Sequence, residues 1–281
     1  MVSKLTTAAL LSEGWRRLTA AIEHPGLDAE VLLAHVLQTN RARLHSHSSE
    51  QPAEREREAY LALVDRRARG EPLAYLIGHK EFWSLELAVG PEVLVPRPET
   101  ELLVERALQL RPEPGGEVAD LGTGSGAIAL ALARERPGWH IVATDLSQGA
   151  LAVARRNASR LGASTVEFVA GNWFAPLAGR SFHLVLSNPP YVAAADPLLR
   201  MAPLNFEPRI ALTPGDEALA DLRSIIEGAP EHLERGGWLL LEHGATQAAP
   251  VARELQARGF SAIRAHRDLA GHERVTEGRW P

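Results

Sequence analysis

The chain has 281 residues, 45% of them hydrophobic, which is enough for two modest domains with real cores, and it contains no cysteine, which excludes disulfides and thiolate metal sites. Its formal net charge of -5 disfavours bare nucleic acid as the main partner, because phosphate binding needs a basic surface. No apolar run approaches the length of a membrane span and no signal-peptide pattern begins the chain, so we expect a cytoplasmic protein with no membrane partner.

The segment from Leu5 to about Gly70 shows apolar residues at helical spacing. We expect three helices: one over residues 8–22, one after the breaker Pro25-Gly26, and one from near Pro52 to Gly70. The run of alternating charges at residues 54–58 is typical of a solvated helix face, and it could also dock a partner. The sequence therefore predicts a small helical domain over residues 1–73.

Residues 74–98 lose the helical period and are expected to link two domains. Apolar and polar residues alternate from Phe82 to Val89, and Val93–Val95 follow after Gly90-Pro91, which predicts a short hairpin. A new helix is expected from residues 97–100 to Leu110, with breakers between Pro112 and Gly116 ending it.

From Glu117 onward, short apolar runs alternate with helical patterns, which is typical of a doubly wound parallel α/β sheet. This second domain is expected to span residues 99–281. The expected strands are 118–121, 140–144, 166–170, 182–186 and 238–241, with an antiparallel pair at 260–265 and 274–277, and the expected helices are 127–136, 147–161, 217–233 and 247–258.

A glycine-rich turn, Asp120 to Gly126, lies between the first of these strands and the next helix. Its spacing is G-x-G-x-G, whereas dinucleotide sites have G-x-G-x-x-G. Asp120 would repel a pyrophosphate but suits a ligand that carries an ammonium and a sulfonium. Asp145 ends the following strand, where a carboxylate can accept hydrogen bonds from both ribose hydroxyls. The pattern favours S-adenosyl-L-methionine over a dinucleotide.

The segment Ser187-Asn188-Pro189-Pro190-Tyr191 follows the expected strand 182–186. The Asn188 side-chain oxygen and the Pro189 carbonyl could each accept one N–H of a planar NH2 group, while the Tyr191 ring covers its face. The plainer alternative is a simple turn, since Asn-Pro and Pro-Pro are common turn dipeptides. A dinucleotide enzyme would leave this segment without a role.

Several motifs stand in the order seen in bacterial release factor glutamine methyltransferases of the HemK type, which the chain resembles from about Gly70 to its end. They are Tyr75 to Gly78, Glu81 to Trp83, Val95 to Glu101, Asp120 to Gly126, Ser187 to Tyr191, Phe206 to Arg209 and Leu241 to Gly244. The resemblance implies a seven-stranded class I methyltransferase sheet joined by a hairpin to an N-terminal helical domain for substrate docking. It also implies methylation of the side-chain amide of the glutamine in the Gly-Gly-Gln loop of peptide chain release factors.

The resemblance also implies a role for each motif. The methionine part of the cofactor would be wrapped by the glycine-rich turn, the ribose held by Asp145 and the adenine packed near Trp173. Catalysis would fall to Asn188, Pro189 and Tyr191. The implied cofactor residues are Asp120, Gly122, Thr123, Gly124, Ser125, Gly126, Asp145, Trp173 and Asn188, and the implied substrate residues are Asn188, Pro189, Pro190, Tyr191, Arg97 and Glu99.

The sequence leaves the roles of several residues undecided. His183 stands where the family usually has Asp, Glu207-Pro208-Arg209 forms either a lid or an ion pair, and His243 is favoured as a structural residue over a base. The eleven histidines show no metal spacing. The alternatives are an adenine-N6 DNA or RNA methyltransferase, because adenine presents the same planar NH2, and a cofactor-binding interaction protein without turnover.

Overall fold

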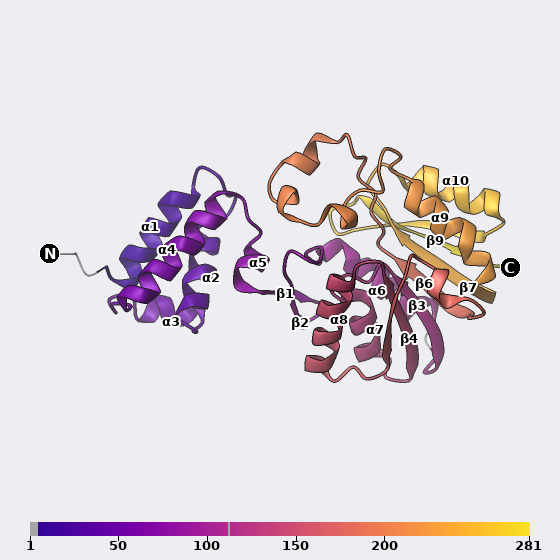
Figure 1. The fold of residues 1–281 in the computed structure, drawn as a ribbon, viewed down its shortest axis with the longest axis horizontal. Helices are drawn as coiled ribbons and strands as arrows, with labels where there is room; N and C mark the ends of the chain where they lie inside the picture. Colours follow the sequence, from indigo (N-terminus) through magenta and orange to yellow (C-terminus); the bar gives the residue numbers. More distant parts are fainter. Residues whose placement is uncertain (1–4, 112) are drawn as a thin grey trace. The chain divides into compact units, whose positions relative to one another are not determined.

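The computed structural model describes residues 5–111 and 113–281 and divides into two compact units (Figure 1). The smaller unit comprises the chain up to Gly78 together with a later segment, Arg200–Phe206. The larger unit comprises His79–Leu199 and Glu207–Pro281. Pro112, expected to help end a helix, lies outside the described residues. Within the described ranges no helix is long and apolar enough to cross a membrane.

The smaller unit is helical, as expected, and is built around a buried cluster that includes Leu10, Leu32 and Tyr60. Two short helices were not predicted, because five or six residues are too few to show a helical period. One of them lies where we expected the helical pattern to have ended, at Ala74, and Pro25 begins a helix rather than only breaking one. The helices are α1 (Thr7–Leu18), α2 (Pro25–Val36), α3 (Arg41–Ser46), α4 (Glu54–Ala68) and α5 (Leu73–Ile77).

A two-stranded hairpin begins the larger unit, but its strands differ from the prediction. Strands β1 (His79–Phe82) and β2 (Leu85–Ala88) pair antiparallel, and Val93–Val95 form no strand. Trp83 and Ser84 make the turn with φ of 51° and 56°. The Trp83 N–H donates to the Glu101 carboxylate at 2.8 Å, which stabilises this turn. The expected strand over 82–89 was wrong because the alternation of apolar residues continues across the turn.

The larger unit contains the expected seven-stranded α/β sheet, in the order β5-β4-β3-β6-β7-β9-β8. Five neighbouring strands, β5, β4, β3, β6 and β7, pair in parallel, while β9 runs antiparallel to both β7 and β8. The strand order reverses between β3 and β6, and ligands bind at such a reversal in open α/β sheets. The strands are β3 (Gly116–Leu121), β4 (Trp139–Asp145), β5 (Val166–Ala170), β6 (Phe182–Ser187), β7 (Leu233–Glu242), β8 (Ser261–Arg267) and β9 (Glu273–Arg279).

Helices cover both faces of this sheet (Figure 1). Neighbouring strand residues point to opposite faces: Val118 packs with α6 (Glu101–Leu110), α7 (Ala127–Glu135) and α8 (Gln148–Leu161), whereas Ala119 packs with α9 (Ala220–Gly228) and α10 (Ala248–Arg258). The expected helix over 217–233 was too long. Pro230 lies in a short 3-10 turn after α9, and β7 begins at Leu233.

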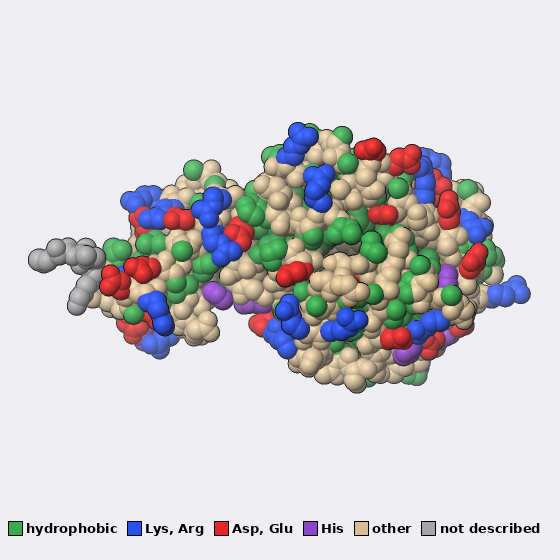
Figure 2. All heavy atoms as spheres, viewed as in Figure 1, with side chains coloured by type: hydrophobic (Ala, Val, Ile, Leu, Met, Phe, Trp, Pro, Cys, Tyr) green, Lys and Arg blue, Asp and Glu red, His purple; other side chains and the backbone are tan. Residues whose placement is uncertain are grey.

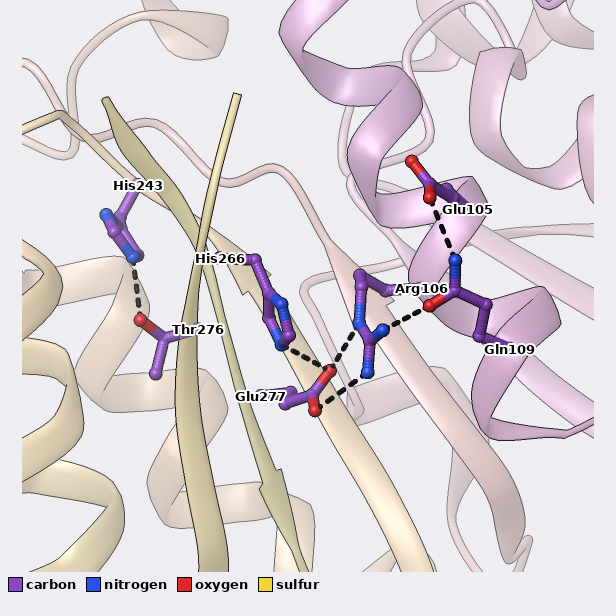
Figure 3. A network of polar contacts seen from close by, with 7 residues as sticks. All are labelled: Glu105, Arg106, Gln109, His243, His266, Thr276 and Glu277. Atoms are coloured by element: carbon purple, nitrogen blue, oxygen red, sulfur yellow. Dashed lines mark hydrogen bonds and ion pairs between the residues drawn. The ribbon is translucent and has the colours of Figure 1, made fainter. Parts of the chain in front are cut away.

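A buried ion pair joins helix α6 to strand β9 (Figure 3). Arg106 Nε and Nη2 each donate to the Glu277 carboxylate at 3.0 Å, and Glu277 is 1% exposed. His266 lies 3.0 Å from the same carboxylate, and Gln109 accepts a further hydrogen bond from Arg106. This network fixes the helix that begins immediately after Thr100.

We predict that the ion pair is important for stability. Replacing Arg106 by alanine leaves the buried Glu277 carboxylate without its bidentate partner, so the free energy of unfolding should fall by about 3 to 5 kcal/mol in urea denaturation. The control is Arg160→Ala, which removes the exposed pair with Glu86 and should cost less than about 1 kcal/mol. Equal losses in the two variants would contradict this role.

Candidate active site

The carboxyl ends of the central strands meet at one edge of the sheet. In the parallel register Ser187 of β6 lies beside Leu121 of β3 and Leu241 of β7. The Ser187 hydroxyl donates to the Leu121 carbonyl at 2.7 Å, which ties the two strand ends together. The glycine-rich turn after β3 and the segment beginning at Asn188 after β6 therefore start side by side.

The glycine-rich turn adopts a left-handed backbone conformation that would be strained for residues other than glycine. Gly122, Gly124 and Gly126 have φ of 75°, 56° and 84°. The N–H groups of Gly122 and Thr123 both donate to the Thr144 carbonyl at 2.9 Å, which fixes the turn against β4. A Cβ on Gly122 would lie 3.1 Å from the Trp173 ring. Glycine therefore lets the backbone approach this ring closely.

Asp120 supports the turn from inside the protein. Its side chain is fully buried, and one carboxyl oxygen accepts a hydrogen bond from the Thr123 hydroxyl at 2.7 Å. Burial raises the pKa of Asp120 to about 7. The other oxygen, Oδ1, has no hydrogen-bond partner in the described protein. An unpaired buried acceptor beside the turn fits a ligand that carries an ammonium group.

Asp145 ends β4 and faces the turn. Its Oδ2 accepts from the Gly124 N–H at 2.9 Å, and its Oδ1 accepts from the Ser147 N–H at 2.8 Å. Burial raises the pKa of this carboxyl. Each oxygen keeps a further lone pair, so the group can still accept hydrogen bonds from ribose hydroxyls.

A pocket of about 340 Å³ lies within the larger unit at this edge, a size typical of small-ligand sites. It brings together nine site residues predicted from the sequence: Gly122, Thr123, Gly124, Ser125, Asp145, Trp173, Asn188, Pro190 and Arg97. Thr100, which lies in the same motif as Arg97 but was not predicted as a site residue, also lines it. The predicted residues Asp120, Gly126, Pro189, Tyr191 and Glu99 do not line it. The wall also includes Val93, Leu94, Ile210 and Thr213, which no sequence signal marked.

Asn188 is held by a residue whose role the sequence did not reveal. Its Nδ2 donates to the Thr100 hydroxyl at 3.1 Å, and Thr100 is 5% exposed. The Tyr191 carbonyl accepts from Gln247 at 3.2 Å, which fixes the end of the same segment. Burial raises the pKa of Tyr191 to about 12, so its phenol is neutral at physiological pH.

Of the two alternatives for Glu207, the ion pair is present. Arg97 donates to the Glu207 carboxylate at 2.5 Å, and the Val95 N–H donates to its other oxygen at 3.2 Å. Glu207 is buried. The pair therefore holds the segment before α6 to the chain that follows the Asn188 motif, and both segments contribute to the pocket wall.

His243 is engaged at both ring nitrogens, and its contact with Thr276 is drawn in Figure 3. Nδ1 lies 2.9 Å from the Gly244 carbonyl and must donate to it, while Nε2 lies 2.8 Å from the Thr276 hydroxyl. Burial lowers the pKa of His243, which favours this neutral form. A structural role, as expected, agrees with these contacts. His183 accepts from the Glu117 N–H at 3.1 Å, and within the described ranges no cluster of His, Asp or Glu is arranged to hold a metal ion.

Two family models match the chain. Residues 9–78 match the PrmC N-terminal domain, and residues 98–202 match the Methyltransferase small domain. The release factor glutamine methyltransferase of Xylella fastidiosa (strain Temecula1) is 50% identical over 267 residues, covering 94% of this chain and 97% of the relative. That of Escherichia coli (strain K12) is 44% identical over 260 residues, covering 92% and 94%.

The sheet order, the glycine-rich turn and the acidic end of β4 define a class I methyltransferase that uses S-adenosyl-L-methionine. A methyltransferase from Pyrococcus furiosus has this fold, with a TM-score of 0.55 at 20% identity over 76% of this chain and 98% of that one. The catalytic domain of hMettl16 in complex with an RNA hairpin of MAT2A also has it, with a TM-score of 0.58 at 17% identity over 98% and 90%. Within this class, the chain belongs to the release factor glutamine methyltransferase family, which confirms the resemblance.

We predict that Gly122→Ala weakens cofactor binding. A side chain at this left-handed position costs about 1 to 2 kcal/mol and would meet the Trp173 ring, so the affinity for S-adenosylmethionine should fall roughly tenfold in calorimetry. The control is Gly162→Ala, because Gly162 has a φ of 68° at the end of α8 and nothing within 4 Å of the added Cβ. The control should lose a similar amount of stability and keep its affinity. An unchanged affinity in Gly122→Ala would exclude a close approach of the cofactor here.

Proposed function

We propose that this chain transfers a methyl group from S-adenosyl-L-methionine to the side-chain amide nitrogen of the glutamine in the Gly-Gly-Gln loop of peptide chain release factors. The observation that carries the proposal is the position of Asn188, on the wall of the pocket formed by the glycine-rich turn. The names of the relatives, which are 40% to 50% identical over almost the whole chain, support the acceptor.

The bound cofactor supplies an electrophilic methyl group on a sulfonium. The acceptor amide is a poor nucleophile, because its nitrogen lone pair is delocalised into the carbonyl. In the proposed arrangement the Asn188 side-chain oxygen and the Pro189 carbonyl each accept one N–H of that amide. These acceptors orient the lone pair, and they stabilise the positive charge that grows on the nitrogen during transfer. The Tyr191 ring covers the face of the acceptor amide.

Orientation is the main contribution that we assign to the protein. Holding two reactants in a near-attack geometry is worth up to roughly 7 to 11 kcal/mol. The bond between the amide nitrogen and the methyl group forms as the bond between the methyl group and sulfur breaks, which leaves the cofactor as the neutral thioether. No strong base is required, because the positively charged amide is acidic enough to release its proton to water. Tyr191 is neutral and His243 is engaged at both ring nitrogens, so the fold offers neither as a free base.

The remaining site residues are assigned by the same proposal. The turn Gly122 to Gly126 holds the methionine part of the cofactor, with Asp120 beneath it, Asp145 holds the ribose and Trp173 contacts the adenine. Arg97 and Glu99 contribute to substrate binding. Arg97 lines the pocket, whereas Glu99 does not, so its contact would require a substrate that extends beyond the pocket.

We also propose that the helical domain, residues 1–73, docks the release factor, with residues 74–98 as a linker and residues 99–281 carrying out the transfer. Release factors act on ribosomes in the cytoplasm, which would be the location of this enzyme. No direct nucleic-acid partner is proposed. On the face drawn in Figure 2, Lys and Arg side chains lie interspersed with Asp and Glu side chains instead of forming one basic patch.

The second candidate is methylation of adenine N6 in DNA or RNA, because the same acceptors would suit that NH2 group. The hMettl16 structure contains RNA, but its 17% identity supports the fold alone. The two candidates can be separated by offering labelled S-adenosylmethionine with a release factor, with DNA, and with ribosomal RNA. Label on the release factor, and one added methyl on its Gly-Gly-Gln peptide by mass spectrometry, is expected. Label on nucleic acid alone would overturn the proposal.

We predict that Asn188→Ala lowers kcat about 100-fold or more, the loss typical for removal of a preorganised hydrogen-bonding group that acts in the transition state. Its Kd for S-adenosylmethionine should stay close to that of the unchanged protein, because the glycine-rich turn and Asp145 remain. Single-turnover methyl transfer to a release factor and calorimetry measure the two quantities. A variant with full turnover would remove Asn188 from the chemistry.

A further inference from the structure

A buried carboxyl group next to the Asn188 motif has no role in the chemistry described so far. Glu242 is the last residue of β7, is 1% exposed, and has one oxygen, Oε2, without a hydrogen-bond partner in the described protein. Ser187 pairs with Leu241 in the parallel register, so Asn188 and Glu242 each follow directly after a paired residue at the same edge of the sheet. A buried carboxyl group is costly to retain without a partner.

Thr100 connects this carboxyl group to Asn188. The Thr100 hydroxyl accepts a hydrogen bond from Asn188 Nδ2 at 3.1 Å. Thr100 also lowers the pKa of the Glu242 carboxyl through a side-chain hydrogen bond. Thr100 lies directly before α6, which the Arg106–Glu277 ion pair fixes to β9 (Figure 3). The hydroxyl is therefore held in place between two side chains at the strand ends.

The direction of this chain of hydrogen bonds follows from the chemistry of its members. A hydroxyl has one proton, and an ionised carboxylate can only accept. When Glu242 is ionised, Thr100 must therefore donate to it, which leaves only lone pairs of the Thr100 oxygen for Asn188. Asn188 can meet them only with its NH2 group. The carboxamide oxygen is then the atom left for the acceptor amide.

We propose that Thr100 and Glu242 are positioning residues that fix the Asn188 carboxamide with its oxygen available to the substrate, an inference that rests on the proposed function. Without them the carboxamide could rotate by 180° and present N–H groups. An NH2 group facing an NH2 group would repel the substrate that the site has to hold. The pair therefore determines whether the site accepts hydrogen bonds or donates them.

The electrostatic surroundings make this arrangement sensitive to pH. Burial, with a smaller contribution from Glu99, raises the pKa of Glu242 to about 7, against the opposing effects of the hydrogen bond from Thr100 and the charges of Arg274 and Arg97. Of the other titratable neighbours, Tyr191 and His243 are both neutral near pH 7, since burial raises the pKa of one and lowers that of the other. Protonated Glu242 can donate to Thr100, which removes the fixed direction. Activity should therefore fall as the pH drops through about 7.

The test compares Thr100→Val, which removes the hydroxyl but keeps the shape, with Thr100→Ser, which keeps the hydroxyl. Removing a residue that orients an active group typically costs about 10- to 100-fold, as is known for the partners of metal ligands. We expect a loss of that size in kcat for Thr100→Val, with little change in the Kd for S-adenosylmethionine, and recovery of most activity in Thr100→Ser. Equal kcat values for Thr100→Val and the unchanged protein, or equal losses in both variants, would overturn the proposal.

Thr276→Val is the matched control. Thr276 is also fully buried and hydrogen-bonded to a side chain of the same sheet edge, His243, but it does not contact Asn188, Thr100 or Glu242 in the described hydrogen bonds. We expect this variant to keep its kcat. A loss equal to that of Thr100→Val would show that any buried hydroxyl here matters equally and would overturn the specific role.

Glu242→Gln tests the pH dependence. Its side chain does not ionise, so the decline of kcat below about pH 7 should flatten and the plateau at higher pH should be lower. An unchanged acid limb in this variant would overturn the role of Glu242.

A second measurement does not depend on turnover. In the unchanged protein the Asn188 side-chain NH2 should give a distinct, exchange-protected pair of NMR signals, assigned with Asn188→Ala, and Thr100→Val should remove the protection. Protection that persists in Thr100→Val would contradict the proposal. If the unchanged protein methylates no release factor, the proposed function fails, whereas normal methylation by Thr100→Val rejects only this inference.

Discussion

The parallel pairing of β3, β6 and β7 is the constraint on which the site depends. The register places Leu121, Ser187 and Leu241 side by side, and the Ser187 hydroxyl fastens two of the strand ends. Whatever follows these strands must then meet at one edge. Cofactor and acceptor sites are thus brought together by the backbone hydrogen bonds of the central sheet.

Buried carboxyl groups give this edge its electrostatic character. Burial raises the pKa of Asp120, Asp145 and Glu242, and each of them accepts hydrogen bonds that fix a neighbouring segment. Two ion pairs with buried carboxylates anchor the surrounding chain: Arg97 with Glu207 and Arg106 with Glu277. The segments that form the site are therefore fixed by polar contacts within the protein. Such support is needed because a loose site loses the benefit of orientation.

Much of the fold could be predicted from local pattern. The parallel strands are short apolar runs between turn residues. The glycine-rich turn and the Asn188 motif each directly follow such a run, so their positions at strand ends could be predicted. The hairpin was misplaced, because the alternation of buried residues runs through the turn at Trp83 and Ser84. The short helices α3 and α5 are below the length at which a period can be seen.

The supporting contacts of the site could not be predicted in the same way. Thr100 reaches Asn188 across 88 positions of sequence, and Glu207 reaches Arg97 across 110. Nothing in the local sequence marks such pairs, since they arise only when the strand order brings distant ends together. The family resemblance identified the motifs that contain Thr100, Glu207 and Glu242 but not what these side chains contact. The structure supplies those contacts.

The central claim is that an acceptor-only site for an amide NH2 lies beside the cofactor turn. A crystal structure of the protein with S-adenosylhomocysteine and a peptide containing Gly-Gly-Gln tests it most directly. The account predicts that the glutamine amide nitrogen lies within hydrogen-bonding distance of Asn188 Oδ1 and the Pro189 carbonyl and faces the cofactor sulfur. A glutamine whose carbonyl oxygen faces Asn188, or one bound away from this pocket, would contradict it.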